Sequence, residues 1–576
     1  MTLVLLIVVP FAAALVFLLA GDRLGRRLTG ALGTAALAFA FGIALAIGQA
    51  FAAGKTFLLA EIGSWLPLRG ADLSLRIEPT AVALVLSITG IGALVALAAA
   101  SERPAIAGVG RLFFALEMLT GGALLVVTAR DLILLLAGWG AVGLSSSLLL
   151  GHARQTTEGA IAGARSFVFA RASDVALLIG TLALLALFRT VDISEISGRI
   201  ATITPTPAAG NALLAASLLI VIAALVRTAQ LPVHFWLAGA SRGPAAADAA
   251  VQAVATLSGA ALLIRLAGAL HPTALAAAAI IGAITAVVAM ACVLASGTGR
   301  RRESWMTVAQ LGAVVVVCAA GSSFAAILVA VASASARAAA ALAAEGGTGS
   351  QRRIARALAA AASLATLITA GLLLGHDRAP FALAVLLAAV FASAHLGRVV
   401  RHGERDDGTA AAGMSAPGDA RADRVGALAR WLAGVLLAAA ALVVIPLALS
   451  GGLSLGAPAS SVTPGTVGLI ALVAVAIAFA LGVRGVTAQE RFPRWLRADR
   501  ASDTLYERGV LAPVRLIAAI LDRGGEASID RGGELLGVVL ARTSACARAM
   551  GLASVWRHEA IVLAAAVAIA LYWTLR

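Results

Sequence analysis

The chain has 576 residues, of which 61% are hydrophobic and 13% are charged, and its mean hydropathy is +0.98. So large an apolar fraction excludes a soluble globular protein and indicates a polytopic membrane protein. The formal net charge of +15 comes from arginine, because Lys55 is the chain's single lysine. Whether this charge marks a nucleic-acid-binding protein depends on where the arginines lie.

Windows of about 20 residues predict an all-α fold of about sixteen transmembrane helices. Taken in chain order, the predicted spans are 1–20, 30–53, 80–100, 111–129, 132–151, 165–188, 212–228, 244–268, 273–297, 305–322, 324–345, 355–375, 380–398, 428–449, 467–485 and 558–575. The first span has no signal-peptide cleavage pattern, so we expect it to remain as a helix of the mature protein.

The arginines gather in alternate loops between these spans, for example around Arg23 and Arg300 and in the long runs 398–430 and 484–557. The positive-inside rule makes these loops cytoplasmic and places the N-terminus outside. The charge therefore reflects membrane topology, and we expect the lipid bilayer, not nucleic acid, as its partner.

The spans of the N-terminal half carry charged side chains, whose burial in a bilayer costs free energy. Glu117 lies inside the span 111–129, where a carboxylate must be paired or hydrated. It is a functional candidate, although pairing with a neighbouring arginine would explain it equally well. Arg171 and Asp174 are three residues apart on one helix, a spacing that predicts a structural ion pair.

The stretch 227–266 combines Arg227, Gln230 and His234 with breaks at Pro232 and at Gly243–Pro244. Proline removes backbone donors, so helical hydrogen bonding must stop there. A broken helix that carries charge is typical of an ion site in a transporter. The alternative is a helix hairpin with a polar turn at the membrane surface.

The later part of the chain adds one intramembrane cation, Arg337, in a run of alanine and serine that favours close helix packing. The chain is predicted to consist of six parts. They are N-terminal helices and an outer loop (1–79), a transmembrane core (80–398), a cytoplasmic loop (399–427), further helices (428–485), a cytoplasmic amphipathic segment (486–557) and a terminal helix (558–576). Cys292, Cys318 and Cys546 have no metal-binding or redox spacing. We expect no cofactor and no metal in this chain.

Four motifs and their order along the chain resemble those of a known family. They are GWGAVGLSSSLLLG at 138–151, EGAIAGARSFVFARASDV at 158–175, RTAQLPVHFWLAGASRGP at 227–244 and RRRESWMTVAQLG at 300–312. In this order they resemble the antiporter-like subunits of proton-pumping NADH–quinone oxidoreductase (respiratory complex I), most closely subunit L. Mrp-type antiporter subunits and the proton-conducting subunits of hydrogenase and inorganic-carbon-uptake complexes are related to them.

This resemblance implies two inverted repeats, each with a broken helix, and a polar axis at the middle of the membrane along which protons move. The family's glutamate falls at Gly140, its first lysine at Arg227, its histidine at Gln252 and its later lysine at Arg337. No second broken helix is recognisable in residues 355–398. The candidates for the proton pathway are Arg227, Gln252, Arg337, Glu117, His234 and Arg300.

Arginine keeps its proton where lysine releases one, so these replacements predict a divergent member with impaired or rerouted conduction. The function expected first is a non-redox membrane subunit that couples electron transfer to proton translocation in a bacterial cytoplasmic membrane, beside other membrane subunits. One alternative is a cation/proton antiporter subunit or the proton-conducting subunit of an inorganic-carbon uptake complex. Another is a non-conducting structural paralogue. Glu117 is a candidate replacement for the carboxylate missing at Gly140.

Overall fold

A computed structural model describes residues 2–402, apart from short gaps at 22, 65, 102–107, 154–155, 203–205, 238–242, 297–298, 321–322, 344–348 and 375–377, together with residues 428, 431–439, 512, 516 and 542. The chain divides into two compact units, residues 1–498 and 499–576, and the elements below belong to the first. The predicted loop 399–427, most of the spans 428–449, 467–485 and 558–575, and the amphipathic segment 486–557 lie outside the described residues.

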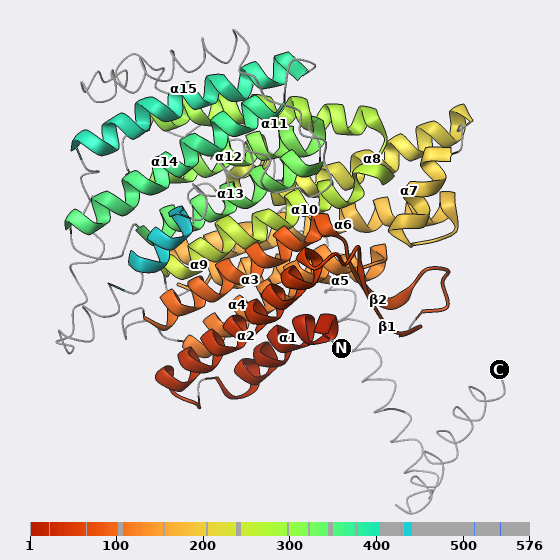
Figure 1. Ribbon diagram of the computed structural model, residues 1–576, viewed down its shortest axis with the longest axis horizontal. Helices are drawn as coiled ribbons and strands as arrows, with labels where there is room; N and C mark the ends of the chain where they lie inside the picture. Colours follow the sequence, from red (N-terminus) through yellow and green to blue (C-terminus); the bar gives the residue numbers. More distant parts are fainter. Residues whose placement is uncertain are drawn as a thin grey trace, which may run out of the picture. The chain divides into compact units, whose positions relative to one another are not determined.

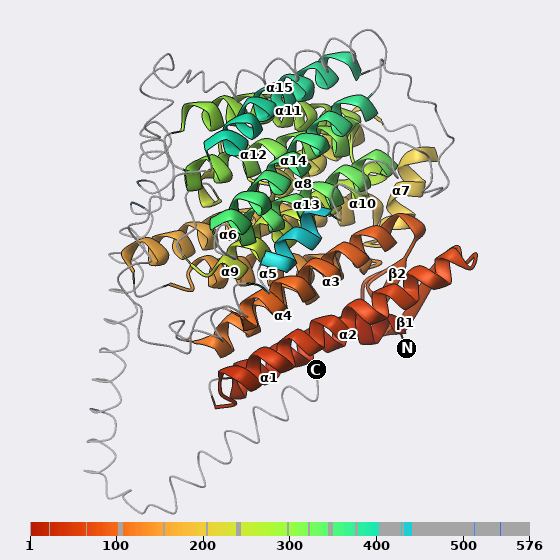
Figure 2. The ribbon, with the colours of Figure 1, turned by 60° about the vertical axis from the view of Figure 1, so that its left-hand side comes forward.

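The fold is a bundle of long helices, as predicted (Figures 1 and 2). Among the described residues, twelve helices are long and apolar enough to cross a membrane. In chain order the helices are α1 (Thr2–Ala20), α2 (Arg26–Ala52), α3 (Pro79–Ala100), α4 (Val109–Thr128), α5 (Leu132–Leu150), α6 (Thr157–Phe188), α7 (Ile193–Thr202), α8 (Pro207–Arg227), α9 (Ala245–Ala250), α10 (Thr256–Leu266), α11 (Pro272–Ala295), α12 (Gly299–Ala320), α13 (Ser323–Ala343), α14 (Gly349–Leu373) and α15 (Ala379–His402). In both views α1 and α2 lie on one side of the bundle and α14 and α15 on the other.

One end of the bundle is closed by the predicted outer loop. Strands β1 (Leu58–Ser64) and β2 (Asp72–Ile77) form an antiparallel hairpin. Isolated bridges join Leu75 to Ala129 and Asp131 to Asp192, which ties the hairpin and the α6–α7 connection to the turn between α4 and α5. At the opposite end, Arg111 donates to the carbonyl of His152 at 2.8 Å. The α4–α5 turn and the contact between Arg111 and His152 thus lie at opposite ends of α4 and α5.

Several elements differ from their predicted bounds, and α8, α12 and α14 begin five or six residues before the predicted spans at 212, 305 and 355. Helix α6 begins at Thr157, eight residues before the expected start, because Thr156 caps it by accepting the amide hydrogen of Gly159 at 3.1 Å. The short helix α7 was not predicted, since its ten residues include charges and do not form an apolar span. Within 355–398, where no second break was recognisable, residues 355–373 belong to α14 and residues 379–398 belong to α15.

The predicted span 244–268 is a helix in three parts. Pro244 lies at the N-cap of α9, a π-helical turn follows at Val251–Ala255 (η2), and α10 completes the crossing before a short 3₁₀ turn at Ala267–Ala269 (η3). A π turn opens the regular hydrogen-bond ladder and is found mostly at functional sites. The broken stretch and this turn position the groups described next.

Candidate functional site

Arg227 is the last residue of α8 and is buried inside the bundle, with 3% of its side chain exposed. Its Nη2 lies 3.3 Å from Oδ1 of Asp174 on α6 and 3.2 Å from the carbonyl oxygen of Trp139 on α5. The guanidinium carbon lies 4.5 Å from the centre of the Trp139 ring. A carboxylate, a carbonyl and an aromatic face together stabilise this buried cation.

Asp174 is shared between two arginines. Its Oδ2 lies 2.7 Å from Nη2 of Arg171, so the structure contains the predicted ion pair. The sequence did not predict that the same carboxylate also binds Arg227. The Arg171 side chain is 44% exposed, whereas that of Arg227 is buried. Asp174 therefore connects the surface of α6 with the interior.

The space occupied by the Arg227 guanidinium depends on glycine. A Cβ atom at Gly143 of α5 would lie 3.1 Å from both Nη1 and Nη2 of Arg227. A Cβ atom at Gly259 of α10 would lie 3.2 Å from Cβ and Cγ of the same arginine. Both distances are shorter than ordinary van der Waals contact, so these glycines allow α5 and α10 to approach the arginine.

The chain between α8 and α9 is the predicted helix break, and several of its described polar groups are paired. Gln230 Nε2 donates to the carbonyl of Thr228 at 2.7 Å, and Trp236 Nε1 donates to the carbonyl of Val226 at 2.7 Å. The amide of Leu231, just before Pro232, donates to Thr285 Oγ1 of α11 at 3.1 Å. Irregular backbone is tolerable at membrane depth when protein groups satisfy it in this way.

His234 begins the 3₁₀ turn His234–Trp236 (η1) inside this break and is buried. Its ring centre lies 4.9 Å from that of Trp305 on α12 and 4.3 Å from that of Phe235. Aromatic contacts therefore hold the imidazole of His234 against α12. The second predicted break point, Gly243–Pro244, immediately precedes α9.

A second buried cluster surrounds Arg337 of α13. Its Nε donates to the carbonyl of Gln252 at 2.7 Å, its Nη2 donates to Thr256 Oγ1 at 3.2 Å, and its Nη1 donates to Ser333 Oγ. Gln252 belongs to the π turn, where the widened ladder leaves carbonyls open to other donors. The irregular turn thus provides a binding place for a cation on the neighbouring helix.

Side-chain hydrogen bonds connect this cluster to α12. Thr307 Oγ1 donates to Gln252 Oε1 at 2.7 Å, and Ser333 Oγ donates to Gln310 Oε1 at 3.2 Å. The glutamine at position 252 is therefore bound through both its side chain and its backbone. The predicted candidate Arg300 lies in the first turn of α12, and its side chain falls outside the described residues.

The two arginine clusters meet on α10. Gly259 lies against Arg227, and Thr256, three residues earlier, accepts a hydrogen bond from Arg337. Three residues correspond to a rise of about 4.5 Å along a helix. Helix α10 therefore packs against both arginines, at Gly259 against Arg227 and at Thr256 against Arg337.

Glu117 lies on α4, separate from the position that the family glutamate would occupy. Arg111 of α4 binds the carbonyl of His152, two residues beyond the end of α5, and by this antiparallel register Glu117 is about level with residue 146. Gly140 is about 9 Å farther along the bundle, at a rise of 1.5 Å per residue. A Cβ atom at Gly140 would meet nothing within 4 Å. The carboxylate beside Arg227 comes from Asp174 instead.

Glu117 is nonetheless unusual. Its side chain is fully buried, and neither carboxylate oxygen has a hydrogen-bond partner in the described part of the chain. Placing a carboxyl group inside a bilayer costs free energy, so Glu117 is a functional candidate.

Comparison with known proteins supports the reading of the motifs. Residues 129–373 match the family model "NADH:quinone oxidoreductase/Mrp antiporter, TM". The chain is 30% identical over 330 residues to NADH-quinone oxidoreductase subunit L of Mycobacterium tuberculosis, covering 55% of this chain and 50% of that protein. It is 28% identical over 338 residues to a probable inorganic carbon transporter subunit, DabB1, of Halothiobacillus neapolitanus, covering 55% and 56%.

The chain thus spans about half the length of these curated relatives. In fold it resembles a chain of the Mrp complex from Dietzia sp. DQ12-45-1b, with a TM-score of 0.70 and 19% identity over 95% of this chain and 63% of that one. The Arg227 and Arg337 clusters and the broken helix between them all fall inside residues 129–373. The protein is therefore a subunit L-like, antiporter-type multi-pass membrane protein, with the NADH:quinone oxidoreductase/Mrp antiporter membrane domain at residues 129–373.

Proposed function

We propose that this chain is a proton-translocating membrane subunit of an NADH–quinone oxidoreductase-like complex in a bacterial cytoplasmic membrane. The observation that carries the proposal is the ion pair between the buried Arg227 and the half-buried Asp174, at the point where α8 ends and the helix break begins. Other membrane subunits would pack beside it, and electron transfer would take place in partner subunits. The chain would supply the proton pathway.

Asp174 is the group of this cluster whose charge changes during transport. Arginine keeps its proton, so Arg171 and Arg227 act as fixed charges on either side of it. When Asp174 takes up a proton, its attraction for Arg227 weakens, and the Arg227 guanidinium retains the carbonyl and ring of Trp139. Because Arg227 stands at the start of the break, this change reaches the irregular segment directly.

A cation/proton antiporter subunit or the proton-conducting subunit of an inorganic-carbon uptake complex is the second candidate. The similarity to DabB1 and to a chain of the Mrp complex favours it. The genes beside this one distinguish the candidates, because redox subunits, antiporter subunits and a carbonic-anhydrase-like protein each indicate a different complex. A non-conducting paralogue would explain Gly140 and the missing lysines, but the retained helix break after Arg227 argues against it.

Proton flux in sealed vesicles that carry the purified complex tests the proposal. We expect the wild type to acidify the lumen when NADH or an ion gradient is supplied, and Arg227→Ala to abolish this flux. Glu117→Gln tests the separate proposal that Glu117 takes part in the pathway, and unchanged flux would remove it. Arg189→Ala, at the exposed end of α6, is the matched control. A silent wild type in an assembled complex would favour the structural paralogue.

A further inference from the structure

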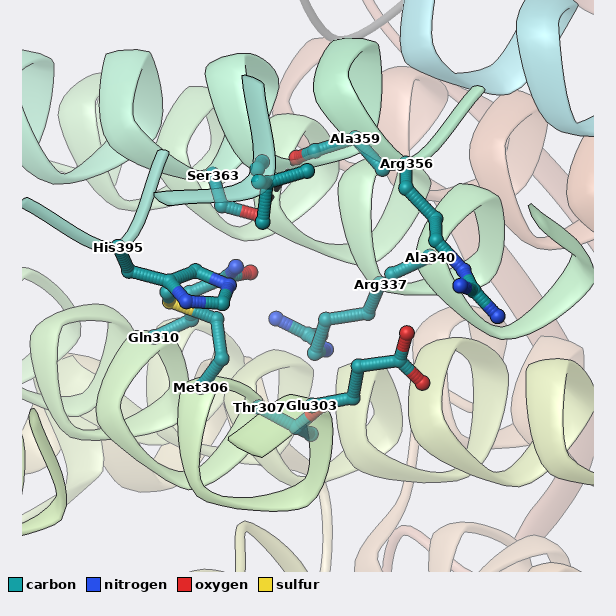
Figure 3. A pocket seen from close by; sticks show the side chains of 12 residues that line it. Glu303, Met306, Thr307, Gln310, Arg337, Ala340, Arg356, Ala359, Ser363 and His395 are labelled. Carbon is teal, nitrogen blue, oxygen red and sulfur yellow. Dashed lines mark hydrogen bonds between the residues drawn. The ribbon is translucent and has the colours of Figure 1, made fainter. Parts of the chain in front are cut away.

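A small cavity lies among four helices beside the Arg337 cluster (Figure 3). Its volume is about 30 Å³, which is room for about two water molecules. Each helix contributes a charged or ionisable side chain: Glu303 from α12, Arg337 from α13, Arg356 from α14 and His395 from α15. We call this space the His395 cavity.

These four groups differ in what they do with a proton. Arg337 and Arg356 stay protonated, and all three guanidinium nitrogens of Arg337 donate to the groups described above. His395 is buried, with 5% of its surface exposed. Histidine is the side chain whose ordinary charge change falls between pH 5 and 8. Among the residues that line the cavity, His395 is therefore suited to gain and lose a proton under physiological conditions.

Helices α12 and α14 also carry Arg302, Arg352 and Arg353, which do not line the cavity. Helix α11 also packs against α15, and its sequence contains no charged residue; Cys292 is its one ionisable side chain. Further along α15 itself stand Arg398, Arg401 and His402, whose side chains fall outside the described residues. Glu303 is the one carboxylate that lines the cavity.

The cavity adjoins the Arg337 cluster. Gln310 and Thr307 line it, and they are the residues that bind Ser333 and Gln252 of the Arg337 cluster. In Figure 3 the ring of His395 and the amide of Gln310 lie on one side of the Arg337 guanidinium, and the carboxylate of Glu303 lies on the other. Water in the cavity would therefore contact His395, Arg337 and Glu303 together.

We propose that His395 is a proton-carrying residue of this chain and exchanges protons with water in the His395 cavity. The proposal rests on the proposed function. A hydrated proton passes to a neutral ring nitrogen of His395 and leaves a neutral water molecule. The imidazolium then returns the proton through water to the Glu303 carboxylate, which becomes a neutral acid. No bond other than those to the proton changes, and Arg337 remains a fixed positive charge throughout.

The first test is proton flux in sealed vesicles that carry the assembled complex. We expect His395→Asn to lower the flux about tenfold or more, because a positioned acid–base group usually contributes at least that much to the rate. His271→Asn is the matched control, because His271 caps α11 outside the cavity and asparagine is also a good cap. Full flux in His395→Asn would overturn the proposal, and loss of flux in Glu303→Gln alone would assign the carrier to Glu303.

The second test uses the wild-type protein and does not depend on whether a variant folds. Exchange of the histidine C2 hydrogen with deuterium, followed residue by residue with mass spectrometry, reports both water access and protonation. We expect the C2 hydrogen of His395 to exchange, because water in the cavity reaches the ring. Absence of exchange would overturn the proposal even in a transporting protein. A wild type without proton flux would count against the proposed function and remove this inference with it.

Discussion

Arg227 and Asp174 stand 53 residues apart in the sequence and form an ion pair inside the bundle, with 3.3 Å between Nη2 and Oδ1. The pair joins the end of α8 to the middle of α6. Because Arg227 is buried, removing its carboxylate would leave an uncompensated charge in the interior. The stability and the proposed activity of the protein therefore depend on the same contact.

Asp174→Asn should destabilise the folded protein by about 3–5 kcal/mol, the usual cost of breaking a buried ion pair on one side. Thermal unfolding of the detergent-solubilised protein measures this loss. Glu61→Gln is the control, since its ion pair with Arg130 lies at the outer surface and such pairs contribute about 0–1 kcal/mol. Equal melting temperatures for Asp174→Asn and Glu61→Gln would show that the interior pair does not stabilise the fold.

Arg227→Lys should raise proton flux above that of the wild type. A buried lysine releases its proton when its surroundings change, whereas arginine does not. The replacement also loses contact with the Trp139 ring, so a stability loss of about 1 kcal/mol accompanies it. A pH-sensitive dye inside vesicles measures the flux. If flux is unchanged, the fixed charge at position 227 does not limit conduction.

The helices and the break followed from the sequence, but the contacts between helices did not. Apolar runs of about 20 residues fix the spans, and proline and glycine fix the break after Arg227. The spacing of Arg171 and Asp174 predicts their pair because both lie on α6. That Asp174 also reaches Arg227 depends on how α6 packs against α8, which no local pattern specifies.

The His395 cavity likewise could not be predicted from the sequence, because it depends on contacts between helices. Glu303 and Arg356 adjoin arginine runs and resemble charges in loops, whereas Arg337 and His395 lie inside predicted spans. That these four residues share one cavity depends on helix packing, which the sequence does not specify. The π turn at Val251–Ala255 was not predicted either, because that segment contains neither proline nor glycine to mark an irregularity.

Gly143→Ala should destabilise the protein by about 1–3 kcal/mol, the usual cost of overpacking a core. The new methyl group would lie 3.1 Å from both terminal nitrogens of Arg227 and would push the guanidinium from its position. Gly140→Ala, one turn away on α5, is the matched control, because its methyl group would meet nothing within 4 Å. Thermal unfolding of both variants measures the loss of stability. Equal melting temperatures for Gly143→Ala and Gly140→Ala would mean that Arg227 moves aside without a loss of stability.

Thr256→Val should cost about 1.5–3 kcal/mol, because it removes a hydrogen bond to the buried Arg337 guanidinium while keeping the shape of the side chain. Thr369→Val is the control, since the Thr369 hydroxyl bonds to the carbonyl of Ala365 on its own helix. The difference between the two melting temperatures isolates the bond to Arg337. No difference would indicate that Ser333 and the Gln252 carbonyl suffice to hold the cation.

Asp131→Asn tests the outer end of the bundle through its pH dependence. Burial raises the pKa of Asp131 above its ordinary value, and the charge of Asp192 adds to this, although the amides of Ile133 and Leu134 oppose it. The folded state therefore binds the proton more tightly than the unfolded state, and the resulting stability is lost as pH rises through the folded pKa. Asparagine also caps helices but does not ionise. Asp131→Asn should match the wild type at acid pH and exceed it in melting temperature near neutral pH.

Glu195→Gln provides the opposite control for that experiment. The hydroxyl of Thr190 and the guanidinium of Arg199 lower the pKa of Glu195, so its contribution to stability is present above its ordinary pKa and is lost as the pH falls. Melting temperatures of the wild type and both variants, measured from pH 4 to 8, should therefore diverge in opposite directions as the pH rises. An Asp131→Asn protein that melts below the wild type at neutral pH would mean that the ionised carboxylate, through its two amide bonds of 2.8 Å each, stabilises the turn between α4 and α5 more than its burial costs.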